Sequence, residues 1–93
     1  MNIQQQETDT KGSFFVSDAG DRLAEMSYSK AGTSLIIIDH TEVSDLLRGQ
    51  GAGKKLVEAA VEYARKSGIK ILPLCPFARS VFDKMPEWAD VLN

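Results

Sequence analysis

The sequence of 93 residues contains a single cysteine, Cys75, so an internal disulfide is impossible. A chain without disulfides fits a reducing compartment, and we therefore expect a cytoplasmic protein. The polar N-terminal stretch has no apolar segment of the kind found in secretory signals. The longest aliphatic run, residues 35–38, is far too short to cross a bilayer, so no membrane association is expected.

The sequence also lacks an excess of basic residues, since 11 lysines and arginines stand against 13 acidic residues and the net charge is -2. Proteins that bind nucleic acids neutralise phosphates with a basic face, so this charge argues against a general nucleic-acid binder but allows a small basic site. The length predicts one domain, and no repeat or linker divides it. We expect a loosely placed polar segment at residues 1–12 and a single domain at residues 13–93.

Three segments in the N-terminal half have strand character. Residues 13–18 are rich in aromatic and β-branched side chains, and residues 22–29 alternate between apolar and polar, which predicts a strand with one covered face. Residues 33–43 contain the aliphatic run 35–38, which predicts a strand that is buried there on both faces. Because the connections between these strands are short turns, we expect an antiparallel meander.

From Gly53 the apolar residues recur at steps of three and four, and Gly68 follows as a C-terminal cap, which predicts an amphipathic helix. A strand at residues 69–75 and a short helix at residues 77–84 come next. In the order β-β-β-α-β-α, a right-handed crossover makes the third and fourth strands parallel, so we expect an α/β (α+β) fold with helices packed on a mixed sheet. Four aromatic residues are interpreted as packing residues: Tyr63, Phe77, Phe82 and Trp88.

The segment "RGQGAGKK", residues 48–55, lies directly before the predicted helix. A Walker loop requires glycine where Arg48 stands and Ser or Thr where Lys55 stands, and a dinucleotide fingerprint requires glycine at Lys54, so neither motif is present. What remains is R-x-x-G-x-G at a helix start, where backbone amides without an intrahelical acceptor form an anion site. The two lysines are unfavourable beside those amides unless an anion such as pyrophosphate is bound. The alternative interpretation is a flexible turn with solvated lysines.

These residues resemble motif A of the GCN5-related N-acetyltransferases. The stretch "DHTEV…LLRGQGAGKKLVEAAVEYARKSGIKILPLCPFA" is similar to a small, single-domain branch of that family, and the similarity runs from about residue 33 to residue 78. It rests jointly on "HTEV", the R-x-x-G-x-G loop and "CPFA" at these relative positions.

The resemblance implies a GNAT-like mixed sheet and the binding of acetyl-coenzyme A. In the family, loop amides hold the pyrophosphate of coenzyme A, which maps onto Arg48, Gly49, Gln50, Gly51, Ala52, Gly53 and Lys54. The pantetheine arm would pair with the preceding strand near Glu42 and Val43, and the thioester would lie where the third and fourth strands splay apart. Full-length members have further N-terminal helices and C-terminal strands, so we expect an acceptor side that is minimal or completed by another molecule. Separately, a domain this small is able to form a homodimer through an exposed sheet edge.

Acetyl transfer to an amine requires a base that removes the amine proton. Histidine side chains in general exchange protons near neutral pH. His40 is the only histidine, and Glu42 projects from the same face of the strand, so either residue is a candidate base, directly or through water. Cys75 is expected beside the thioester, where a thiolate could accept the acetyl group and pass it on, and His40 is able to approach it in space. The alternative for His40 and Glu42 is a solvated polar pair at the end of the strand. The alternative for Cys75 is a small buried residue that packs as a hydrophobic side chain does.

The sequence therefore predicts an acetyl-coenzyme A-binding N-acetyltransferase that acts on an unidentified amine. The alternative hypotheses are a non-catalytic or weakly catalytic acetyl-coenzyme A-binding module or sensor, and an unrelated phosphate-binding α/β domain. No metal, nucleic acid or membrane partner is expected.

Overall fold

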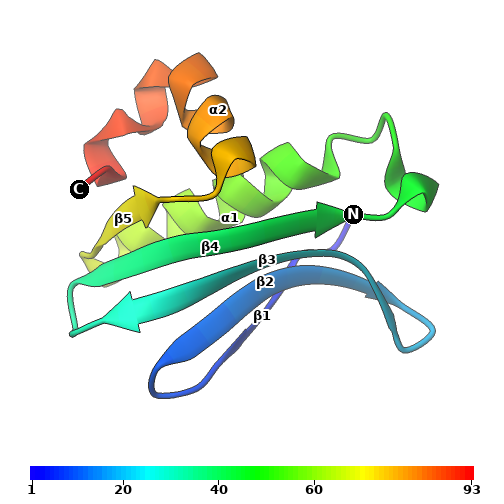
Figure 1. Ribbon diagram of the computed structural model, residues 1–93, viewed down its shortest axis with the longest axis horizontal. Helices are drawn as coiled ribbons and strands as arrows, with labels where there is room; N and C mark the ends of the chain where they lie inside the picture. Colours follow the sequence, from blue (N-terminus) through cyan, green and yellow to red (C-terminus); the bar gives the residue numbers. More distant parts are fainter.

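The computed structural model of the protein describes residues 1–93 and contains five strands, two α-helices and two short 3-10 helices (Figure 1). In chain order the elements are β1 (Gln4–Glu7), β2 (Lys11–Asp18), β3 (Asp21–Ala31), β4 (Leu35–Val43), η1 (Asp45–Leu47), α1 (Ala52–Ser67), β5 (Lys70–Pro73), α2 (Pro76–Lys84) and η2 (Pro86–Val91).

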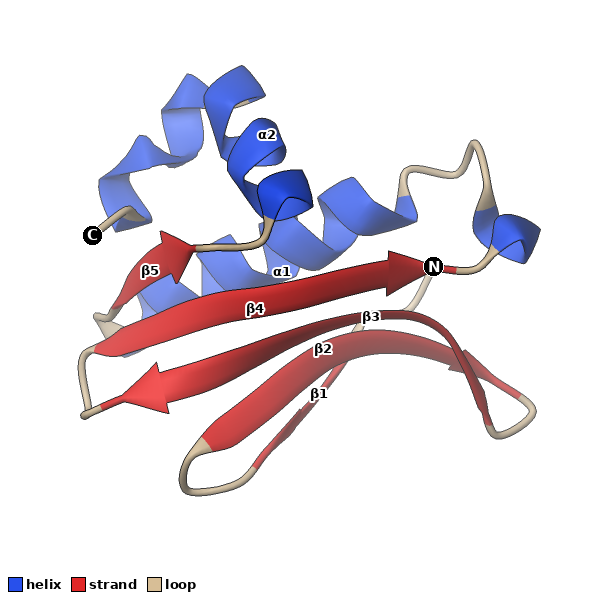
Figure 2. Ribbon diagram, viewed as in Figure 1, coloured by secondary structure: helices blue, strands red, loops and turns tan.

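The five strands form one sheet in the order β1-β2-β3-β4-β5 (Figure 2). The first four strands pair antiparallel, and β5 pairs parallel to β4 after the crossover through α1. The mixed sheet and the parallel last pair confirm the fold class predicted from the sequence.

The expectation that residues 1–12 are loosely placed is wrong for residues 4–7 and also for residues 11–12, which begin β2. Residues 4–7 form β1, which pairs with β2 from Gln4 opposite Phe15 to Glu7 opposite Gly12. The sequence QQQE has no strand propensity, so the strand owes its position to tertiary partners. The Glu7 carboxylate accepts hydrogen bonds from Tyr28 at 2.7 Å and from Lys30 at 2.7 Å, which attaches β1 to β3.

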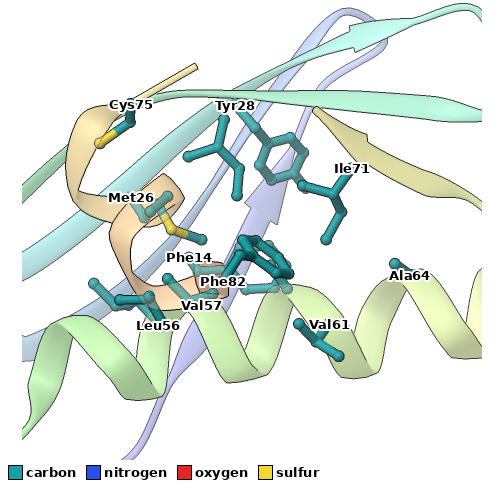
Figure 3. Close-up of a cluster of buried hydrophobic side chains, with 14 of the residues drawn as sticks. Phe14, Met26, Tyr28, Leu56, Val57, Val61, Ala64, Ile71, Cys75 and Phe82 are labelled. Carbon is teal, nitrogen blue, oxygen red and sulfur yellow. The ribbon is translucent and has the colours of Figure 1, made fainter. Parts of the chain in front are cut away.

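The core lies between the sheet and the helices, which both pack on one side of it (Figure 1). Ala24, Met26 and Tyr28 of β3 are buried in it, as their alternation predicts, and Figure 3 shows Met26 and Tyr28 above α1. In β4, Ile36 and Ile38 are buried, whereas Leu35 and Ile37 are only half-buried. The prediction of burial on both faces is therefore wrong for β4, because no helix covers the second face.

The helices have the predicted extents within one residue. Gly68 ends α1 in a left-handed conformation, φ 70°, and its amide donates to the Ala64 carbonyl. Phe82 and Trp88 are buried as predicted. None of the helices combines the length and the apolar character that a membrane-spanning helix requires.

Candidate active site

The parallel strands β4 and β5 separate halfway along β4. Their pairing runs from Leu35 opposite Lys70 to Ile38 opposite Pro73. The amides of Leu74 and Cys75 then both donate to the Ile38 carbonyl at 3.1 Å, and the chain turns away into α2. Residues 39–43 of β4 therefore have no strand partner on that side, which leaves an open stretch of strand edge beside α2.

A β-bulge at Asp39 decides which way the following side chains point. Ser27 of β3 pairs with His40 and Tyr28 pairs with Ile38, so Asp39 is the extra residue on β4. An extra residue reverses the alternation of side chains beyond it. Without the bulge, His40 and Glu42 would share the core face with Ile38; with it, they lie on the face that the helices leave open.

His40 and Glu42 contact each other on this open face. His40 Nε2 lies 3.0 Å from Glu42 Oε1, and the two side chains are 67% and 77% exposed. They share a small hollow of about 100 Å³ with Glu25 and Ser27 of β3. The spacing of two residues thus brings the pair together as predicted, in a position open to solvent.

Cys75 lies on the other face of the sheet, at the N-cap of α2. It is 5% exposed, and its thiol donates to Thr41 Oγ1 at 3.4 Å. The contact shows that Thr41, between His40 and Glu42, points to the core side. His40 and Cys75 are therefore on opposite faces, and the expected approach of His40 to the thiol is not found.

The environment of Cys75 lowers the pKa of its thiol below the usual value. Burial acts in the opposite direction and is the largest single influence. It is outweighed by hydrogen bonds that favour the thiolate, from the Thr41 hydroxyl and from the backbone amides of Ala78 and Phe77 at the start of α2. Amides at a helix N-terminus stabilise a thiolate in this way because they carry partial positive charge.

The glycine loop ahead of α1 presents backbone donors without partners. Gly49 and Gly51 have φ of 80° and 70°, a left-handed conformation that glycine adopts without strain. The amides of Arg48 and Gln50 donate to the carbonyls of Asp45 and Leu47 in η1, at 3.1 and 3.2 Å. The remaining amides, those of Gly49, Gly51, Ala52, Gly53 and Lys54, donate to no acceptor in the protein, and Gly51 provides no side-chain cap.

A cavity of about 450 Å³ lies between this loop, the end of β4 and α2. All the predicted loop residues line it except Gln50, and Val43 lines it from the open strand edge. Glu42 does not, because its side chain is on the opposite face. Arg48 is held at the rim by an ion pair with Asp45, with Arg48 Nη2 2.9 Å from Asp45 Oδ1.

The opposite wall of the cavity was not predicted. It consists mainly of one side of α2 and the residue after it: Phe77, Ser80, Val81, Lys84 and Met85. Phe77, interpreted from sequence as a packing residue, is 41% exposed and covers Gly53, where a Cβ would overlap its ring. Gly53 has no left-handed φ, so it is required for this close approach of the two helices and not for the turn. No His, Cys, Asp and Glu side chains are grouped as metal ligands would be.

Comparison with protein families gives a match over residues 13–91 to the GCN5-related N-acetyl-transferase family. The chain belongs to this family. A GCN5-like protein from Staphylococcus aureus, solved in solution by NMR, is 40% identical, with a TM-score of 0.74 over 99% of this chain and 89% of that chain. Membership of this family confirms the resemblance to GCN5-related N-acetyltransferases that was seen in the sequence.

More distant acetyltransferases share the fold. The ribosomal-protein-alanine N-acetyltransferase from Brucella melitensis is 16% identical, with a TM-score of 0.68. The match covers 84% of this chain and 62% of that chain. AAC(6')-Iy, solved with a bisubstrate analogue that contains coenzyme A, is 15% identical with a TM-score of 0.57, and 83% of this chain covers 61% of it. The chain thus spans about three fifths of these larger enzymes. A comparison with curated protein sequences gave no match.

Proposed function

We propose that this acetyltransferase binds acetyl-coenzyme A in the 450 Å³ cavity and transfers its acetyl group to an amine. The observation that carries the proposal is the loop of residues 49–54, where five backbone amides have no acceptor in the protein and face a cavity with lysines at its rim. Such a helix start binds phosphate groups because its amides converge on one point. The pyrophosphate of coenzyme A supplies the missing acceptors.

The open edge of β4 extends from this loop toward Cys75. A pantetheine arm laid along residues 39–43 can pair with the unpartnered strand edge, as an added strand would. This path leads to the point where β4 and β5 separate, next to Thr41 and Cys75. The thioester then lies between the two faces of the sheet, with Cys75 on one side and His40 on the other.

The amine approaches from the open face, where His40 and Glu42 are exposed. Its nitrogen attacks the acetyl carbonyl, the carbon–sulfur bond breaks, and coenzyme A leaves as a thiolate that takes up a proton. His40 removes the amine proton, directly or through one water, and Glu42 stabilises the imidazolium at 3.0 Å. The pair thus supplies both the base and a charge partner for its protonated form.

Cys75 offers a second route, which its lowered thiol pKa favours. Its sulfur would attack the acetyl carbonyl and release coenzyme A, and the amine would then take the acetyl group from Cys75. The two routes differ in one measurable species. Incubation with acetyl-coenzyme A without an amine, followed by mass spectrometry, yields acetylated Cys75 only by the second route.

Binding is tested by titrating acetyl-coenzyme A while the amide resonances of residues 48–54 are followed by NMR. The expected result is saturable shifts in this loop and at the open edge of β4. Chemical-shift changes confined to other parts of the protein would contradict the proposed binding site. Turnover is tested separately, by incubation with mixed amines and measurement of free thiol; binding without thiol release supports the non-catalytic module instead.

A further inference from the structure

The cavity wall across from the glycine loop carries a lysine, Lys84, that is not part of the proposed pyrophosphate site. Three basic residues line the cavity, Arg48 and Lys54 on the loop side and Lys84 on α2, and no carboxylate lines it. Arg48 is paired with Asp45, whereas Lys84 is exposed and forms no ion pair. The cavity is therefore suited to a ligand with more than one anionic group.

The position of Lys84 indicates which part of a ligand it meets. α2 has 9 residues and begins next to Cys75, so Lys84 stands roughly 12 Å further along the helix axis. With the thioester near Cys75 and the pyrophosphate at the loop, this end of the cavity faces the nucleotide end of the cofactor. There coenzyme A carries a second anionic group, the 3′-phosphate of its ribose.

We infer that Lys84 binds the 3′-phosphate of coenzyme A and makes the site selective for coenzyme A over its 3′-dephospho form. The inference rests on the proposed function, because it places the cofactor in the same cavity. A bound phosphate gives Lys84 the ion pair that it lacks in the protein itself. The contact joins α2 to the ligand on the side that the loop does not reach.

Lys84 also has a structural role at the end of α2, which must be distinguished from the binding of a phosphate. A lysine in the last turn of a helix interacts favourably with the carbonyl end of the helix, and Lys84 occupies that place in α2. That role affects the free energy of unfolding and does not distinguish one nucleotide from another. The decisive measurement is therefore a difference between two ligands and not an affinity for one.

The experiment compares acetyl-coenzyme A with acetyl-3′-dephospho-coenzyme A by calorimetric titration of the wild type, Lys84→Met and Lys55→Met. Methionine keeps the aliphatic stem of lysine. Lys55 is an exposed lysine in the first turn of α1 that does not line the cavity. We expect the wild type and Lys55→Met to prefer acetyl-coenzyme A by about tenfold, typical of one charge-assisted hydrogen bond. Lys84→Met loses this preference and binds the dephospho form as the wild type does.

Each other result has a defined meaning. If the wild type binds both ligands equally, or if Lys84→Met keeps the preference, the inference is wrong while the cofactor site stands. If Lys84→Met lowers the affinity for both ligands by the same factor, Lys84 acts through long-range electrostatic attraction or through the stability of the fold. That result also contradicts the inference. If the wild type binds neither ligand, the proposed function itself fails.

Discussion

Gly51 is the residue at which the chain enters α1, and its backbone has the left-handed φ of 70°. An added Cβ would meet no atom within 4 Å, so only the backbone conformation opposes substitution. Gly51→Ala is expected to lower the free energy of unfolding by about 1 kcal/mol. It is also expected to weaken acetyl-coenzyme A binding at least tenfold, because relaxation of φ redirects the amides that follow. Urea unfolding and calorimetric titration measure the two effects.

Gly32 provides a matched control for this substitution. It has the same φ of 70° and the same open surroundings, but it lies in the turn between β3 and β4. Gly32→Ala should cost about as much in stability and leave the affinity for acetyl-coenzyme A unchanged. Equal losses of affinity in the two variants would show that the loop amides are not the binding site.

Thr41 is the side chain that contacts the Cys75 sulfur, and its hydroxyl lowers the pKa of the thiol. Thr41→Val keeps the shape and removes this donor, so the pKa of Cys75 should rise and the thiolate fraction at a given pH should fall. The thiolate absorbance followed against pH, or the pH dependence of alkylation, measures the change. Thr33→Val, at an exposed turn residue, is the control; a profile unchanged by Thr41→Val contradicts the assigned contact.

The residues of the site divide according to the kind of signal that they leave in the sequence. The loop of residues 48–54 was predictable because glycines, a helix start and lysines each have a local physical meaning. The pairing of His40 with Glu42 followed from their spacing. The face of the sheet on which the pair lies could not be predicted. The bulge at Asp39 leaves no recognisable pattern in the sequence, and it reverses the direction in which the later side chains of β4 point. Thr41 was missed for the same reason.

At the scale of elements, the contact between α1 and α2 depends on Gly53 and Phe77. A Cβ at Gly53 would overlap the far end of the Phe77 ring, so Gly53→Ala should shift that half-exposed ring and lower the free energy of unfolding by up to about 1 kcal/mol, the low end of the cost of overpacking. In the Phe77→Ala background the overlap is absent, and Gly53→Ala should then be neutral or stabilising, since alanine favours a helix. Denaturant unfolding of the four proteins of this double-mutant cycle gives the coupling energy.

The expected coupling has a definite sign. Gly53→Ala must be less harmful when Phe77 is alanine than when Phe77 is present. Additive effects of the two substitutions would mean that Phe77 swings away into solvent at no cost. Glycine at residue 53 would then require another explanation, such as the approach of a ligand.

The elements differ in how clearly the sequence predicted them. β3 and α1 were predictable because each has one covered face, and the apolar period of each matches its geometry. β1 was not, because QQQE is polar at every residue and all four residues are exposed. The wall that α2 gives to the cavity was also not predicted, since a 9-residue helix has apolar residues on more than one side.

At the scale of the whole molecule, Glu7 joins segments that are far apart in the chain. Its carboxylate accepts hydrogen bonds from Tyr28 on β3 at 2.7 Å and from Tyr63 on α1 at 2.9 Å, and Lys30 donates to its other oxygen at 2.7 Å. Gln5 donates to the Tyr28 hydroxyl at 2.8 Å. This cluster attaches the edge strand β1 to the core and stands at the far side of the sheet from the β4–β5 opening.

The same cluster makes the stability of the protein depend on pH. The hydrogen bond from Lys30, and then those from Tyr28 and Tyr63, outweigh burial and lower the pKa of Glu7 below its ordinary value of 4.5. A carboxyl whose pKa is lower in the folded protein stabilises it above the ordinary value, and this contribution is lost as the pH falls through the folded-state pKa. The free energy of unfolding should therefore decrease on acidification below about pH 4.5.

Glu7→Gln removes the charge and keeps the shape, so it should remove part of this pH dependence. We expect it to lower the free energy of unfolding by about 1–2 kcal/mol at neutral pH, because it breaks charged hydrogen bonds, and to have a smaller effect as the pH falls through the folded-state pKa of Glu7. Glu58→Gln, at an exposed residue of α1 that forms no hydrogen bond through its side chain, is the control. Asp90→Asn should reduce the acid dependence separately, because Arg65 lowers the pKa of Asp90 in the same sense. A loss in Glu7→Gln that is constant from neutral to acidic pH would show that β1 is attached by its shape and backbone pairing, and that the charge of Glu7 contributes nothing.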